Sequence, residues 1–325
     1  MEYVNVGQSG LKVSRIILGC MSYGTPRANN GGWTLGLDDA RPFFREAIEA
    51  DITTFDTANV YGLGSSEEVT GKLLGELAKR DEVVITTKVN GQMGPGTNGA
   101  GLSRGAIMTQ IDNSLRRLGT DYVDLYQIHR HDPATPIEET MQALHDVVRA
   151  GKVRYIGASS MWTWQFVTAQ HAADLNGWTR FISMQDQYNL IQREEEREMH
   201  PYCVDQGIGV LPWSPLARGK LTRDWDASTD RSETDRFAPT LYGQTDDADR
   251  KVADAVAEIA GEREVSRAQV ALAWILHQPA VTAPIFGATK PGHVADAVAA
   301  EGLSLSDDEI KRLEERYVPH LPTGF

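Results

Sequence analysis

The chain has 325 residues, a length that fits either two domains of ordinary size or one large α/β barrel. Hydrophobic residues make up 41% and charged residues 24% of the chain, which is ordinary globular usage and excludes a wholly disordered protein. The formal net charge of −13 weighs against binding to nucleic acid or to an anionic membrane, because such a surface repels phosphate groups overall.

Three features indicate where the protein works. The two cysteines, Cys20 and Cys203, are too few for a disulfide framework or a four-cysteine zinc site. The first six residues lack the basic and apolar regions of a signal peptide. The apolar run Val270–Leu276 is far shorter than the roughly 18 residues that a membrane-spanning helix needs. We therefore expect a soluble, cytoplasmic protein with reduced thiols and no membrane partner.

The chain opens with two short β-rich segments, Tyr3–Gly7 and Leu11–Val13, which predict a hairpin. Eight short and mostly apolar runs follow, typical of strands that are buried on both faces. They cover residues 15–19, 53–56, 83–88, 122–127, 153–157, 181–185, 208–213 and 282–287. Helical segments alternate with them, so we predict one α/β domain over residues 1–325: a (β/α)8 TIM barrel with an N-terminal β-hairpin and extra C-terminal helices.

The helical segments carry recognisable start and stop signals. Three sequences match capping boxes and begin at Ser65, Ser266 and Ser306. Pro136 is predicted at the first position of a helix over residues 137–150, which Gly151 ends. Two long loops, one around residues 31–32 and one over residues 217–247, follow predicted strands, and we expect them to cover the active end of the barrel.

Titratable residues stand at the ends of three consecutive strands: Asp56, Lys88 and His129, with Tyr61 in the loop after Asp56. Neighbouring strands of a barrel end at one rim, so these four side chains should cluster. An ammonium beside a tyrosine lowers the pKa of its phenol, a carboxylate holds the ammonium, and a histidine can hydrogen-bond a substrate oxygen. Each residue alone has an ordinary explanation as a loop cap, packing residue or surface charge. Together they predict general acid catalysis on a carbonyl group.

With these motifs in view, nearly the whole chain resembles the aldo-keto reductases. Asp56, Tyr61, Lys88 and His129 look like the family's tetrad, in the family's order. Four further segments match: Gly157–Ser160, Gln185–Asn189, Trp213–Gly219 and Gly287–Lys290. The resemblance implies reversible hydride transfer between NADP(H) and an aldehyde or ketone, with Tyr61 as the proton donor. It also places the chain near the aryl-alcohol dehydrogenase-like and potassium-channel β-subunit-like branches, in a bacterial-type subgroup.

The same resemblance implies a cofactor site across the barrel mouth. Ser159 and Gln185 would hold the nicotinamide amide and Trp213 would stack on its ring. Lys290, before a predicted helix start, suits the 2′-phosphate of NADP. The full set of expected cofactor contacts is Gly19, Met21, Asp56, Ser159, Ser160, Gln185, Trp213, Ser214, Pro215, Leu216, Gly219, Lys220, Arg236, Gly287, Thr289, Lys290, His293 and Asp296.

The sequence departs from the family at Ser160, which could still bond the nicotinamide amide, and at the adenine end. The family often has Asn where Ser160 stands, and Gln, Glu and Asn where His293, Asp296 and Ala297 stand. Ala297 cannot make the polar adenine contact. The expected substrate contacts are Tyr23, Trp33, Asn90, Arg130 and Trp162, which all follow strand ends.

Two other functions stay open at this level. One is an NADPH-binding regulatory subunit with little turnover, which resembles the potassium-channel β subunits. The other is a metal-dependent barrel hydrolase that uses His129, His131 and Asp132, although no carboxylate-rich ligand set appears and no metal site is expected. The segment Gly94–Gly99 fits the dinucleotide-binding pattern of glycines, but it lies too far past its strand and before its helix to act as one. The substrate and the oligomeric state are left undetermined.

Overall fold

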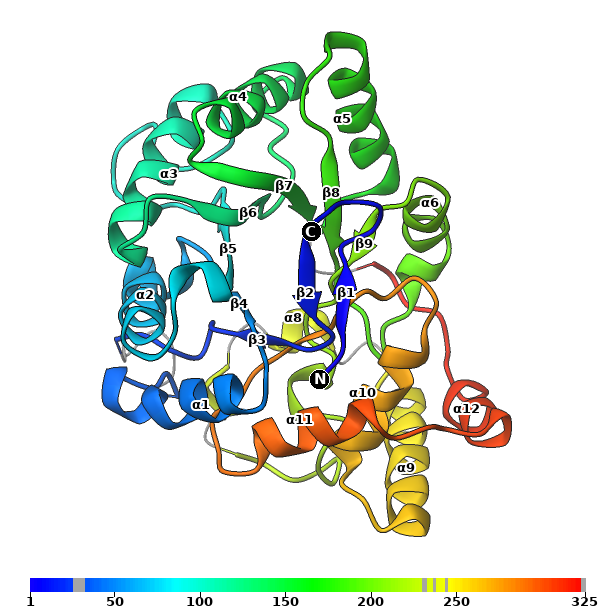
Figure 1. The fold of residues 1–325 in the computed structure, drawn as a ribbon. Helices are drawn as coiled ribbons and strands as arrows, with labels where there is room; N and C mark the ends of the chain where they lie inside the picture. Colours follow the sequence, from blue (N-terminus) through cyan, green and yellow to red (C-terminus); the bar gives the residue numbers. More distant parts are fainter. Residues whose placement is uncertain (26–32, 230–232, 236–237, 243–244, 323–325) are drawn as a thin grey trace.

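A computed structural model describes residues 1–25, 33–229, 233–235, 238–242 and 245–322 of the chain. Eight parallel strands form one curled sheet in the order β10-β3-β4-β5-β6-β7-β8-β9. Parallel bridges from Val210 to Val281 and from Trp213 to Ile285 join its two ends and close the barrel. Helices surround the strands, as Figure 1 shows. The predicted (β/α)8 barrel is confirmed.

The barrel strands are β3 (Ile17–Gly19), β4 (Thr54–Asp56), β5 (Val84–Val89), β6 (Val123–Ile128), β7 (Val153–Ser159), β8 (Phe181–Gln185), β9 (Gly209–Val210) and β10 (Ile285–Phe286). The helices are α1 (Leu37–Glu49), α2 (Ser65–Leu77), α3 (Arg104–Leu118), α4 (Ile137–Arg149), α5 (Thr163–Asn176), α6 (Met199–Asp205), α8 (Ala238–Leu241), α9 (Asp246–Arg263), α10 (Arg267–His277), α11 (His293–Glu301) and α12 (Asp307–Glu314). No helix in this described part of the chain is long and apolar enough to cross a membrane.

The predicted hairpin is confirmed and closes one end of the barrel. Strands β1 (Tyr3–Asn5) and β2 (Lys12–Ser14) pair antiparallel. Val6, Leu11 and Val13 of this hairpin pack with Ile17 and Leu125 of the barrel strands in a buried apolar cluster. In Figure 1 the hairpin lies across the barrel opening in dark blue. The hairpin therefore covers the end where the barrel strands begin, and the strands finish at the opposite end.

Two kinds of expectation need correction. The seventh and eighth strands are only two residues long, although the Leu211 and Trp213 amides after β9 still donate to the Met184 and Asp186 carbonyls. Ser65 does not cap α2: it is the first residue of the helix, Gly64 precedes it at φ 97°, and the Ser65 hydroxyl bonds to the Gly62 carbonyl. Ser306 forms the predicted capping box with Glu309. Ser266 caps α10 through the Gln269 amide, while the Gln269 side chain bonds to Asp296 instead of completing the box.

Candidate active site

The centre of the site is a buried ion pair between two neighbouring strands. Lys88 of β5 has a fully buried side chain, and its Nζ donates to Asp56 Oδ2 at 2.6 Å and to the Thr57 carbonyl at 2.9 Å. Asp56 is the last residue of β4, so the parallel register brings the two together. Burying an unpaired charge at this depth costs much free energy, so each of these two side chains depends on the other to stay charged in the folded protein.

Tyr61 and His129 complete the predicted cluster. Lys88 Nζ lies 5.1 Å from the centre of the Tyr61 ring, and the His129 ring meets the Tyr61 ring edge-on at 5.6 Å. Tyr61 opens the short 3-10 helix Tyr61–Gly64, which turns the chain back over the strand ends through Gly62 at φ 57°. The structure thus brings all four tetrad residues to one point of the barrel mouth.

The charges of these groups are set by their surroundings. Burial by itself would lower the pKa of Lys88, but the Asp56 carboxylate and the Tyr61 hydroxyl outweigh it, so the pKa of Lys88 is raised above its ordinary value. Burial, with the nearby Lys88 and Arg130 cations, lowers the pKa of His129 well below its ordinary value. Lys88 is therefore an ammonium and His129 a neutral imidazole at neutral pH.

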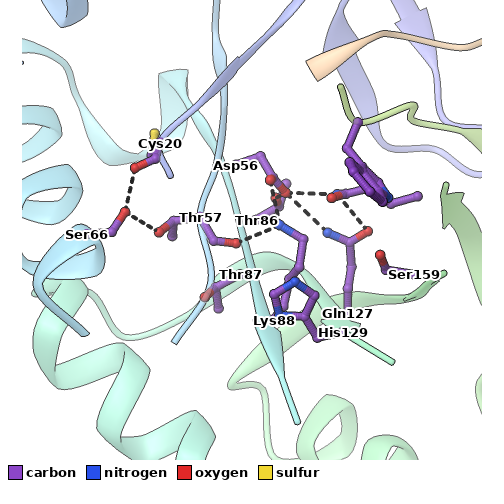
Figure 2. A network of polar contacts seen from close by, with 12 residues as sticks. Cys20, Asp56, Thr57, Ser66, Thr86, Thr87, Lys88, Gln127, His129 and Ser159 are labelled. Carbon is purple, nitrogen blue, oxygen red and sulfur yellow. Dashed lines mark hydrogen bonds and ion pairs between the residues drawn. The ribbon is translucent and has the colours of Figure 1, made fainter. Parts of the chain in front are cut away.

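Asp56 Oδ1 carries a second set of contacts, which sequence reasoning missed. It accepts hydrogen bonds from the Thr86 hydroxyl, from Gln127 Nε2 at 3.3 Å and from Gln185 Nε2 at 3.0 Å. Figure 2 shows Thr86, Lys88 and Gln127 converging on Asp56. Gln127 could have been found from its place in a buried strand, two residues before His129 and hence on the same face.

The residues expected around the nicotinamide line the neighbouring part of the mouth. Ser159 ends β7 and Gln185 ends β8, and the two pair in the parallel register. Ser160 follows at φ 42°, and its hydroxyl accepts the indole N–H of Trp213 at 3.0 Å. Trp213 is half-buried, with the Arg130 guanidinium 5.9 Å from its ring centre. A half-buried aromatic beside three buried polar side chains fits a flat ring that carries a carboxamide.

The loop after β9 is tightly turned. Ser214, Ala217, Arg218 and Gly219 all have positive φ, between 46° and 91°. The chain turns tightly here, and the Ala217, Gly219 and Lys220 amides donate to carbonyls within the same loop. Pro215 is buried and Leu216 half-buried in this loop. Lys220 is engaged with its own surroundings: its ammonium lies 3.8 Å from the Trp225 ring centre and 3.5 Å from Asp246.

The expected adenine-end residues lie together near the start of α11. Gly287 and Lys290 are exposed, and the Thr289 amide donates to His293 Nδ1 at 3.3 Å. Asp296 is half-buried and accepts from Gln269 Nε2 at 2.8 Å, so its carboxylate is tied to α10. Arg236 lies outside the described residues.

Gly19, at the end of β3, packs so closely against Ile285 and Phe286 that a Cβ there would meet Ile285 at 2.9 Å. Met21, just beyond it, is half-buried.

One expected substrate contact is corrected. Tyr23 has no exposed surface: it packs on Phe44 at 5.1 Å between ring centres, and its hydroxyl donates to the Ala288 carbonyl at 2.7 Å. A core partner and a backbone acceptor both hold it away from solvent, so it offers nothing to a substrate.

The other substrate candidates keep some exposure at the mouth. Trp33, Asn90 and Arg130 are half-buried and Trp162 is 46% exposed. Asn90 Nδ2 donates to the Arg130 carbonyl at 3.2 Å, which links two of these loops.

The metal-site alternative has no geometric support. Asp132 accepts from the Leu102 and Ala134 amides and from the Thr135 hydroxyl, so it organises its own loop. The His131 ring lies against Trp164, and the His129 ring lies against Tyr61. Within the described ranges no group of three or more His, Cys, Asp or Glu side chains is arranged to hold a metal ion.

Comparison with known proteins agrees with this geometry. The model of the aldo/keto reductase family matches residues 15–317. Versiconal hemiacetal acetate reductase of Aspergillus parasiticus is 46% identical over 339 residues, which cover 98% of this chain and 98% of that protein. Putative aryl-alcohol dehydrogenases of Schizosaccharomyces pombe and Saccharomyces cerevisiae are 44% and 40% identical, each over 98% of this chain and at least 96% of their own length.

These relatives are fungal, so they do not support the expected bacterial-type subgroup, whereas the names of two of them agree with the expected aryl-alcohol dehydrogenase-like branch. The matched family model spans most of the sequence, and the chain belongs to the aldo/keto reductase family of oxidoreductases.

Proposed function

We propose that the protein is an NADPH-dependent reductase of aldehydes or ketones, which acts as a single barrel domain. The observation that carries this proposal is the convergence of Asp56, Lys88, Tyr61 and His129 at the open end of the barrel. The names of the relatives, a hemiacetal acetate reductase and aryl-alcohol dehydrogenases, agree with this reaction class.

In this proposal Tyr61 delivers the proton to the carbonyl oxygen. The raised pKa of Lys88 keeps a positive charge beside the phenol, which favours the phenolate that forms when the proton leaves. Asp56 holds that ammonium in place at 2.6 Å. His129, neutral because of its lowered pKa, donates a hydrogen bond to the same carbonyl oxygen without competing as an acid.

The residues present fit a nicotinamide dinucleotide. Ser159, Ser160 and Gln185 offer buried hydrogen-bonding groups for a carboxamide, and Trp213 offers a flat face for the ring. The pyrophosphate is assigned to the turned loop after β9, residues 214–219, and the exposed Lys290 suits the 2′-phosphate that distinguishes NADPH from NADH. The chemistry that the bound cofactor supplies here is a hydride for the carbonyl carbon, and the proton from Tyr61 completes the alcohol.

The mouth also indicates the kind of substrate. The side chains of Trp162 and Trp213 supply apolar surface at the mouth, and the Arg130 guanidinium places a positive charge beside the Trp213 ring. We propose an aromatic or similarly apolar aldehyde or ketone that carries a hydrogen-bond acceptor for Arg130.

The test compares NADPH oxidation by the wild type, Tyr61→Phe and the matched control Tyr3→Phe over a panel of aromatic aldehydes. Tyr3 lies in the hairpin at the opposite end of the barrel and bonds to the Asp51 carbonyl. Tyr61→Phe should lose about 10²- to 10⁴-fold in kcat, the usual effect of removing a general acid, while Tyr3→Phe should keep its rate. Equal rates for Tyr61→Phe and wild type would refute the mechanism. A wild type that binds NADPH but completes only slow single turnovers would favour the regulatory-subunit alternative.

A further inference from the structure

Gln127 stands at an unusual place in the barrel. It lies in β6 between two inward positions, Leu125 at the hairpin end and His129 at the mouth, and its side chain is completely buried. The parallel register sets it beside Lys88 on one side and Gly157 on the other. Nothing in the proposed proton transfer uses it directly.

Its amide group makes two contacts that join different parts of the site. Gln127 Nε2 donates to Asp56 Oδ1 at 3.3 Å, and Gln127 Oε1 accepts from Gln185 Nε2 at 3.3 Å. Gln185 Nε2 in turn donates to the same Asp56 oxygen at 3.0 Å. Each of the three side chains is therefore hydrogen-bonded to the other two, and we call this set the Asp56–Gln127–Gln185 triangle.

The barrel layers explain why this triangle forms. Side chains in one layer of such a barrel come from alternate strands, and most are branched and apolar. Asp56, Gln127 and Gln185 come from β4, β6 and β8, which alternate in this way. On the hairpin side the barrel interior is apolar, where Leu125 and Ile17 pack with Val13 of the hairpin in one buried cluster. A primary amide in the next layer is costly unless its donor and acceptor are both bonded, and the triangle provides both bonds.

Packing fixes the Gln127 side chain as well. A Cβ at Gly157 would lie 2.2 Å from Ser183 Oγ and 3.2 Å from Gln127 Cγ, so the neighbouring strand leaves just enough room for these side chains. Gln127 therefore has little freedom to turn its amide away from Asp56.

We propose that Gln127 is a positioning residue that couples the Asp56–Lys88 ion pair to Gln185. This inference rests on the proposed function, because Gln185 is expected to hold the nicotinamide. Gln127 restrains the Asp56 oxygen that does not touch Lys88, so the carboxylate keeps its other oxygen on the ammonium. Gln127 also occupies a donor of Gln185, which fixes how the Gln185 amide faces the cofactor side.

The test uses Gln127→Met, which keeps the side-chain volume and removes both bonds. The matched control is Ser183→Ala, since Ser183 is buried in the same part of the barrel and its hydroxyl has no hydrogen-bond partner among the described residues. Two quantities are measured on both: the affinity for NADPH by titration of tryptophan fluorescence, and the titration of the Lys88 ammonium by NMR of protein carrying ¹³C-labelled lysine. The Lys88 signal is assigned by its absence in Lys88→Met.

We expect Gln127→Met to bind NADPH about three- to ten-fold more weakly, in keeping with one lost hydrogen bond. With Asp56 less restrained, burial should gain influence over Lys88, so the pKa of Lys88 should move to a lower value. Ser183→Ala should change neither of these quantities.

The inference is overturned if Gln127→Met, shown to be folded, has wild-type NADPH affinity and an unmoved Lys88 titration. It is also overturned if Gln127→Met only unfolds more easily and otherwise matches Ser183→Ala, because that outcome shows a purely structural residue. The lysine titration needs neither cofactor nor substrate, so it separates failure of this inference from failure of the proposed reductase activity.

Discussion

Replacing Lys88 by Met tests whether the core of the site is held together as a charge pair. The substitution leaves Asp56 with an almost fully buried side chain, 4% exposed, and no ammonium at 2.6 Å. It also removes the donor to the Thr57 carbonyl. Breaking a buried ion pair by removing one partner typically costs about 3–5 kcal/mol. The bonds from Thr86, Gln127 and Gln185 remain and soften the loss, so we expect about 3 kcal/mol of destabilisation near pH 7.5, at the low end of that range.

The assay is equilibrium unfolding in urea at pH 5.5, 7.5 and 8.5, followed by circular dichroism. The double variant Asp56→Asn with Lys88→Met has no buried charge, and it should recover most of the loss at every pH. The reasoning is refuted if Lys88→Met is as stable as the wild type at pH 7.5, or if the double variant is no more stable than the single one.

Two more predictions follow from the charges at the mouth. The pKa of His129 is lowered in the folded protein, so below about pH 6.5 the unfolded chain binds a proton at this residue and the folded chain does not. The free energy of unfolding should therefore decrease as the pH is lowered below that value. His129→Phe keeps an aromatic ring against Tyr61 but cannot bind the proton. Between pH 7.5 and 5 it should therefore lose less free energy of unfolding than the wild type, by at least about 1 kcal/mol in urea unfolding. An unchanged pH dependence would contradict the lowered pKa. Lys290→Met should weaken NADPH binding about three- to five-fold and leave NADH binding unchanged, as expected for one exposed ion pair. Calorimetric titration with both cofactors measures this, and an equal change for the two would mean that Lys290 does not meet the 2′-phosphate.

The outline of the site could be predicted because strand ends of a parallel barrel share one rim. Once Asp56, Lys88 and His129 were placed at the ends of consecutive strands, their convergence followed from topology alone. Tyr61 was harder, since it lies in a loop, and its place depends on the left-handed turn at Gly62.

The failures have physical causes too. Tyr23 follows a strand end like the true mouth residues, but whether such a side chain faces the pocket or the helices depends on the loop backbone, and here Phe44 and the Ala288 carbonyl hold it inside. Ser65 carried the capping pattern, yet Gly64 already turns the chain, and the Ser65 hydroxyl bonds to Gly62. Local patterns of this kind are overridden when a neighbouring residue or a tertiary contact satisfies the same group.

The sequence by itself determined the order of strands and helices, the barrel they make and the identity of the four residues at its mouth, because apolar periodicity and strand-end positions are local properties of the chain. Only the tertiary structure decided how those residues are held. The Asp56–Gln127–Gln185 triangle joins side chains up to 129 positions apart in the chain, and no local pattern encodes a hydrogen bond between alternate strands across a barrel interior.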